Sequence, residues 1–158
     1  MGKQQYGYTG VYNATALTLA NEEGAAIALD AKGNITPGIY PSGATPTTQS
    51  SGNVANAAAV ATITGAAAKT TYITGFEITG SGATAGSIVS VTVTGLLGGT
   101  ATYTLAVATG AVVGNTALIA AFVPALPSSA VNTSIVVTVP ALGAGNTNST
   151  VVAHGYTI

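Results

Sequence analysis

Residues 88–107 decide the fold class, because IVSVTVTGLLGGTATYTLAV alternates apolar and hydroxyl side chains on both sides of a glycine-rich centre. Successive side chains of a β-strand point to opposite faces, so this alternation predicts two half-buried strands, at 88–94 and 100–107. The glycines of GLLGG at 95–99 predict a hairpin between them. The residues that we expect to face a core are Val89, Val91, Val93, Ala101, Tyr103, Leu105 and Val107.

Strand-like segments continue on both sides of this hairpin, and most are separated by Gly, Asn or Pro. In TYITGFEIT at 71–79, alternation places Tyr72, Phe76 and Ile78 on one face and Glu77 on the other. Little helix is expected, because Thr and Gly interrupt the Ala-rich stretches. With the hairpin, the predicted strands are 60–64, 71–79, 88–94, 100–107, 117–123, 133–139 and 150–158.

Seven strands within residues 54–158 predict an all-β domain built as an antiparallel β-sandwich. The chain contains neither Cys nor Trp, so the hallmarks of the immunoglobulin fold are missing. We therefore expect a jelly-roll-like topology, which the same number of strands allows.

Residues 1–53 predict an extended N-terminal arm of short strands. Strand-like pieces at 14–19 and 25–29 are separated by turn residues, and PSGATPTTQSSGN at 41–53 has the Pro, Ser and Thr content of a linker. The arm is either a flexible tail or a segment that becomes ordered on a partner surface.

Four tyrosines of this arm, Tyr6, Tyr8, Tyr12 and Tyr40, are the candidate partner contacts. Tyr is favoured at interfaces because its ring buries a large area while its hydroxyl group keeps a hydrogen bond. Two alternatives stay open: the rings anchor the arm to its own domain, or they form a platform for a glycan.

Charged side chains make up only 4% of the chain, against about 25% in ordinary globular domains. The net charge is −1 and there is no Arg. Clustered Lys and Arg bind nucleic acid and anionic lipid, so we expect neither as a partner. A surface so poor in charge either is hydrated by Thr, Ser, Asn and Gly or is covered by other protein chains, and we favour the second interpretation.

No run of about 20 apolar residues occurs, so no membrane-spanning helix is predicted. The N-terminal sequence MGKQQYGYTG lacks the apolar segment of a secretory signal. We therefore expect a protein that is made and assembled in a cytoplasm.

The chain has few residues that could carry chemistry. His154 is the only histidine and Asp30 the only aspartate, and no nucleophile-elbow motif accompanies them. Glu22 and Glu23 are neighbours in one turn, which does not suit two carboxylates that flank a substrate bond. DAKGN at 30–34 lacks the repeated acids of a calcium loop. The sequence therefore predicts no catalytic residue, no metal site and no cofactor.

Several phrases of the sequence resemble a family of small virion proteins of tailed phages. They are KTTYITGFEITG at 69–80, VTVTGLLGGT at 91–100, VPALGAGNTN at 139–148 and AHGY at 153–156. The resemblance covers most of the chain and implies a capsid decoration (cement) protein. Such a protein sits on the outer capsid surface as a homotrimer and clamps neighbouring copies of the major capsid protein. It has no active site, so no functional residue carries over.

Two other functions are compatible with the same sequence. One is a receptor-binding or glycan-binding module of a phage tail fibre, which would be present in few copies and would bind a glycan saturably. The other is a surface adhesin domain of a bacterium. An enzyme is the class that the residues favour least.

Overall fold

The computed structural model describes residues 40–41, 43–81, 85–110, 117–142 and 148–158. Every regular element within these ranges is a β-strand, which confirms the all-β fold class. The predicted short strands at 14–19 and 25–29 lie outside the described residues. The eight strands are β1 (Thr45–Ser50), β2 (Ala59–Ile63), β3 (Thr71–Ser81), β4 (Ser87–Leu96), β5 (Gly99–Val107), β6 (Leu118–Pro127), β7 (Ile135–Val139) and β8 (Asn148–Thr157).

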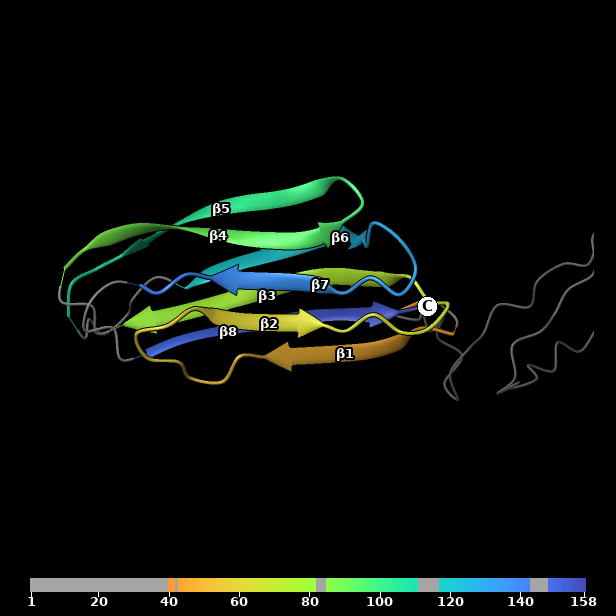
Figure 1. Cartoon of the computed structure of the whole chain (residues 1–158), viewed down its shortest axis with the longest axis horizontal. Helices are drawn as coiled ribbons and strands as arrows, with labels where there is room; N and C mark the ends of the chain where they lie inside the picture. Colours follow the sequence, from red (N-terminus) through yellow and green to blue (C-terminus); the bar gives the residue numbers. More distant parts are fainter. Residues whose placement is uncertain (1–39, 42, 82–84, 111–116, 143–147) are drawn as a thin grey trace, which may run out of the picture. The chain divides into compact units, whose positions relative to one another are not determined.

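The strands form two antiparallel sheets of four, with the orders β1-β8-β3-β6 and β2-β7-β4-β5. The strands pair as in one long hairpin, because each strand of the first half of the sandwich pairs with its counterpart in the second half. The pairs are β1–β8, β2–β7, β3–β6 and β4–β5. Such a long hairpin, rolled so that its strands alternate between two sheets, is a jelly roll. Figure 1 shows the sheets packed face to face, with β5 at the upper edge of the view and β1 at the lower edge.

Strand β1 differs from the sequence prediction, which placed residues 41–53 in a linker. Residues 45–50 instead pair with β8 along their whole length, from Thr45 opposite Thr157 to Ser50 opposite Val152. The sequence TPTTQS has no apolar alternation because β1 is an edge strand whose side chains are exposed or half-buried. Backbone pairing rather than burial holds it, so the sandwich begins before Val54 and the compact unit spans Gly43–Ile158.

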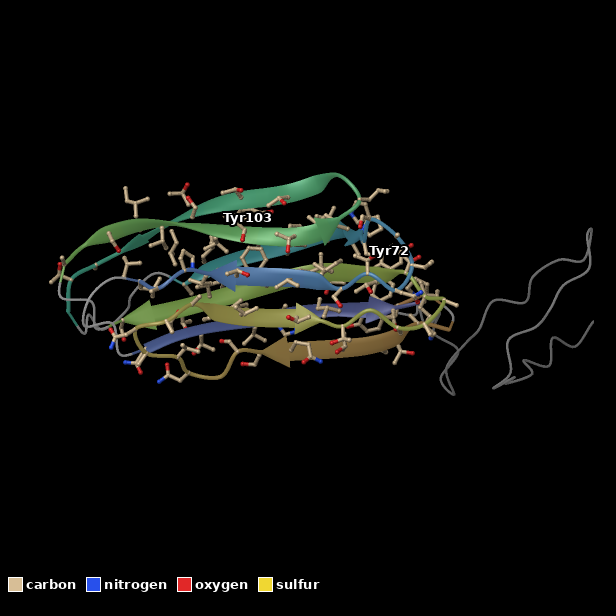
Figure 2. All side chains as sticks on the ribbon, viewed as in Figure 1. Tyr72 and Tyr103 are labelled. Carbon is tan, nitrogen blue, oxygen red and sulfur yellow. The ribbon has the colours of Figure 1, made fainter. Side chains whose placement is uncertain are left out.

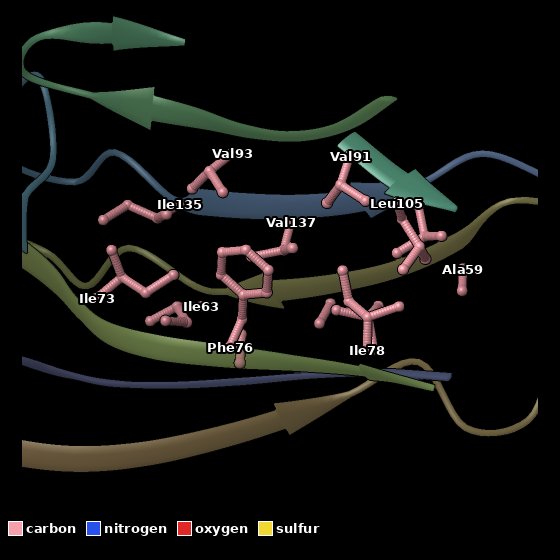
Figure 3. Close-up of a cluster of buried hydrophobic side chains, with 14 of the residues drawn as sticks. Ala59, Ile63, Ile73, Phe76, Ile78, Val91, Val93, Leu105, Ile135 and Val137 are labelled. Carbon is pink, nitrogen blue, oxygen red and sulfur yellow. The ribbon is translucent and has the colours of Figure 1, made fainter. Parts of the chain in front are cut away.

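The core lies between the sheets and consists mainly of Val and Ile. The alternation predicted for residues 88–107 is confirmed: Val91, Val93, Leu105 and Val107 are buried, while the Thr residues between them are half-buried or exposed. The Phe76 ring occupies the middle of the cluster, between Ile73 and Ile78 along β3 (Figure 3). Period-two burial on both sheets is what makes these strands stable as a sandwich.

The predicted face of β3 is wrong for one residue. Ile73, Phe76 and Ile78 face the core, whereas Tyr72 lies outside the core cluster. Ile73 pairs with Gly155 and Gly75 with His154, so Thr74 is an inserted residue relative to β8 and the alternation changes phase there. Gly75 permits this, because a Cβ atom at that position would lie 2.5 Å from the backbone oxygen of Ala120 on β6.

Candidate interaction surface

Acidic, basic and imidazole side chains are scarce in the sandwich. In the part of the chain that the structure describes they are Lys69, Glu77 and His154. His154 lies on β8, and its Nδ1 is 3.1 Å from the hydroxyl oxygen of Thr48 on β1. The Lys69 Nζ donates to the Thr45 hydroxyl oxygen at 3.4 Å, and Glu77 is exposed on β3. These hydrogen bonds tie strand edges together, and among the described residues no three potential metal ligands gather.

The grouping of the four candidate contact tyrosines stays a prediction, because only one of them lies in the described part of the chain. Tyr6, Tyr8 and Tyr12 lie outside the described residues. Tyr40 is described and is 36% exposed, just before the compact unit begins.

Two other tyrosines form a pair at the end of the sandwich where β3 begins. The rings of Tyr72 and Tyr156 stack with their centroids 4.9 Å apart and an angle of 10° between their planes. Figure 2 labels Tyr72 of this pair, together with Tyr103 of β5. Tyr156 is only 8% exposed, so the pair does not present two open ring faces to a sugar. Burial raises the pKa of the Tyr156 hydroxyl group, and the neighbouring Tyr72 raises it further.

This pKa shift predicts an alkaline loss of stability. A raised pKa means that the folded state holds the Tyr156 proton more tightly than the unfolded state, whose pKa is 10.0. The stabilisation is therefore complete below pH 10 and is lost as the pH rises through the folded pKa. We expect Tyr156→Phe to flatten the fall in unfolding free energy above pH 10, measured by urea denaturation from pH 8 to 11. Equal slopes for variant and wild type would contradict the assignment.

One edge of the sandwich is closed and the other is open. Among the described residues, strands β1 and β2 contact each other along the closed edge, whereas β5 and β6 make fewer contacts with each other at the other edge. Most inward-facing side chains of β5 and β6 are only half-buried, whereas Leu105 and Val107 of β5 are buried. We call this side the β5/β6 edge, and its half-covered core residues are Ala101, Tyr103, Leu118, Ala120, Phe122 and Leu126.

Strand β6 is apolar on both of its faces. All ten residues of LIAAFVPALP at 118–127 are apolar. The outward-facing Ile119 is 68% exposed and Val123 is 95% exposed. Edge strands of natural proteins commonly carry charge or polar side chains, because an apolar edge invites association. The edge strand β1, with sequence TPTTQS, follows that rule and β6 does not.

A bulge carries Val123 outward from β6. Ala121 pairs with Gly75 and Leu126 pairs with Ile73, so the four residues 122–125 lie opposite the single residue Thr74. Phe122 points inward and contacts Phe76, with ring centroids 6.1 Å apart. Bulges at sheet edges re-aim side chains, and here the β6 bulge (residues 122–125) projects Val123 and the exposed Pro124 into solvent.

A pocket of about 410 Å³ lies beside the bulge, between the β4–β5 turn and the end of β6. Two backbone hydrogen bonds fix its walls: the Leu97 N–H donates to the Pro127 oxygen at 3.0 Å, and the Ser129 N–H donates to the Gly95 oxygen at 2.8 Å. The predicted hairpin is therefore present, and it is tied to β6. The edge pocket is lined by Leu96, Leu97, Gly98, Gly99, Thr100, Ala101, Leu126 and Pro127.

The β5/β6 edge is suited to binding a neutral, apolar protein surface. Its bulge, its pocket and its half-covered core residues carry no charged side chain. Sequence reasoning missed this surface, although the unbroken apolar run at 118–127 was a visible signal. A half-exposed strand commonly alternates, and a strand that is apolar on both faces is more typical of one covered on both sides.

Comparison of the chain with protein-family models, with curated protein sequences and with solved structures found no match. Within the described residues, no helix has the length and apolar character that are needed to cross a membrane. These comparisons therefore do not indicate what the β5/β6 edge binds.

Proposed function

We propose that this chain is a structural, non-enzymatic virion protein that decorates and stabilises the outer surface of a tailed-phage capsid. The observation that carries the proposal is the apolar β5/β6 edge, where Val123 is 95% exposed on an edge strand. An apolar edge on a jelly roll that is otherwise well packed is best explained by a permanent protein neighbour.

The chemistry of the surface favours assembly over recognition of a charged ligand. From residue 41 onward the only side chains with a permanent charge are Lys69 and Glu77. Specific protein interfaces bury about 800 Å² on each partner, and a few well-packed anchor residues supply most of their free energy. Association of this protein should therefore rest on burial and strand-edge contacts, with little contribution from ion pairs.

The jelly-roll topology and the resemblance of the sequence to phage decoration proteins support the choice of a capsid as the partner. Jelly rolls are common in capsid and lectin domains. A capsid offers many identical copies of its major protein, so a homotrimer bound between them would clamp neighbouring subunits. The protein would be made in the host cytoplasm and would act on the virion surface.

Co-sedimentation with purified capsids that lack this protein tests the proposal. We expect saturable binding at a fixed ratio to the major capsid protein. Because ion pairs contribute little, raising NaCl from 0.1 M to 1 M should change the affinity less than about threefold. Binding that vanishes in 1 M NaCl would contradict the apolar interface, and no binding at any salt concentration would contradict the capsid as partner. Saturable binding of a glycan in a glycan screen would instead support the tail-fibre alternative.

A further inference from the structure

We propose that the β6 bulge and the edge pocket are the two halves of a self-association contact. In this contact Val123 and Pro124 of one copy enter the edge pocket of a second copy. The inference rests on the self-association that is part of the proposed function, and it does not depend on the identity of the capsid.

The bulge and the pocket match in chemistry and in size. The pocket is walled by aliphatic side chains and turn glycines, with Thr100 as its one polar side chain. A volume of about 410 Å³ is near the lower end of the range for small-molecule sites, and it has room for two small aliphatic side chains such as those of Val and Pro. Neither the bulge nor the pocket carries a charge. The charged side chain beside them is the exposed Glu77 of β3, which pairs with Ile119, four residues before Val123.

The bulge of one copy does not fill the pocket of the same copy. Val123 is almost fully exposed, although Leu126 and Pro127 of the same strand line the pocket. About three residues, or roughly 10 Å of strand, separate Val123 in the β6 bulge from the edge pocket of the same copy. A neighbouring copy that lies against this edge can place its own edge pocket over the β6 bulge.

The area available at the β5/β6 edge suits a stable contact. Ten residues of β6 extend for about 33 Å, and the two sheets lie about 10 Å apart. Side chains on the outer faces roughly double this width, so the surface of the β5/β6 edge covers on the order of 700 Å². Specific interfaces bury about 800 Å² on each partner. The edge, which includes the half-covered Tyr103 and Phe122, approaches this area when its bulge and its pocket engage the same neighbouring copy, and a ring of three divides it between two neighbours.

Such a contact is either reciprocal, with each bulge in the pocket of the other copy around a two-fold axis, or head-to-tail, which closes into a ring or continues as a filament. A ring of three uses every bulge and every pocket once and leaves no apolar surface of this kind unsatisfied. A reciprocal dimer also uses every bulge and every pocket once, so the oligomer mass decides between a dimer and the homotrimer of the proposed function.

Cysteine cross-linking tests the contact directly, because the chain has no cysteine of its own. Two separately tagged variants, Val123→Cys and Leu97→Cys, are mixed and oxidised mildly. A disulfide requires Cα atoms within about 7 Å, so we expect cross-linking between the tagged copies. The matched control replaces Leu97→Cys with Ile88→Cys, since Ile88 is 75% exposed on β4 and does not line the pocket. The expected yield with Leu97→Cys is at least fivefold higher than with Ile88→Cys, and equal yields would overturn the proposal.

Sedimentation analysis of charged variants gives an independent readout. Val123→Asp and Leu97→Asp change exposed residues, so both should stay folded by circular dichroism. We expect both to shift from the oligomer to a mass near 15.2 kDa, while Ile88→Asp remains an oligomer. A monomeric wild type, or variants that keep the oligomer mass, would overturn the inference. Failure of the wild-type oligomer to bind capsids would instead overturn the capsid proposal and leave the self-association contact in place.

Discussion

Replacing Phe76 with Ala is expected to lower the free energy of unfolding by about 3–5 kcal/mol. Phe76 is buried on β3 in the middle of the core. Its ring meets Tyr103 of β5 edge-on, with centroids 5.3 Å apart and planes at 72°. It also contacts Phe122 of β6. The three rings join the two sheets where the β5/β6 edge opens, so truncation leaves a cavity and removes both aromatic contacts.

Urea denaturation with two control variants measures this effect. Phe76→Leu keeps much of the side-chain volume and should lose only about 1–2 kcal/mol. Val123→Ala removes an apolar group that is exposed in the single chain, so it should change the stability of the monomer by no more than about 0.5 kcal/mol. A loss below about 1 kcal/mol for Phe76→Ala would show that the rings do not form the continuous core described here.

Two truncations that differ by eleven residues should differ greatly in stability. Removing residues 1–42 leaves the compact unit Gly43–Ile158 complete, and we expect it to unfold at nearly the wild-type urea concentration. Removing residues 1–53 also deletes β1, which pairs with β8 over six residues. About six backbone hydrogen bonds, each with a net contribution of about 0.5–1.5 kcal/mol, predict a loss of roughly 3–9 kcal/mol.

The same pair of truncations separates folding from attachment. If the arm tyrosines Tyr6, Tyr8 and Tyr12 contact a partner, the variant that lacks residues 1–42 should stay folded but bind capsids more weakly than the full chain. Unchanged co-sedimentation would remove these tyrosines from the interface. Equal stabilities of the two truncated proteins would contradict the assignment of β1 to the sandwich.

The strands that could be predicted are those with one buried and one exposed face. Period-two alternation identified the core residues of β4 and β5, because each Val or Leu there is separated from the next by an exposed or half-buried residue. The same reasoning misplaced Tyr72, since an inserted residue changes the phase and alternation counts assume none. The local sign of this irregularity was the glycine at position 75, where a Cβ atom would lie 2.5 Å from the backbone oxygen of Ala120 on β6.

The elements that could not be predicted depend on pairing between distant parts of the chain. TPTTQS has no core-facing pattern, and only its register with β8, more than a hundred residues away, makes it a strand. The interaction surface was missed for a similar reason. Which strands end a sheet is decided by the order of all eight, so LIAAFVPALP could be recognised as an apolar edge only after the topology was known.

The most direct test of the central claim is the copy number of this protein in purified virions of the tailed phage that the proposed function requires as its source. Quantitative mass spectrometry against the major capsid protein gives this number. A capsid decoration protein should be present at a fixed ratio close to that of the major capsid protein. A few copies per particle would indicate a tail-fibre component, and absence from the virion would contradict the proposed function and leave only the jelly-roll fold and its apolar edge.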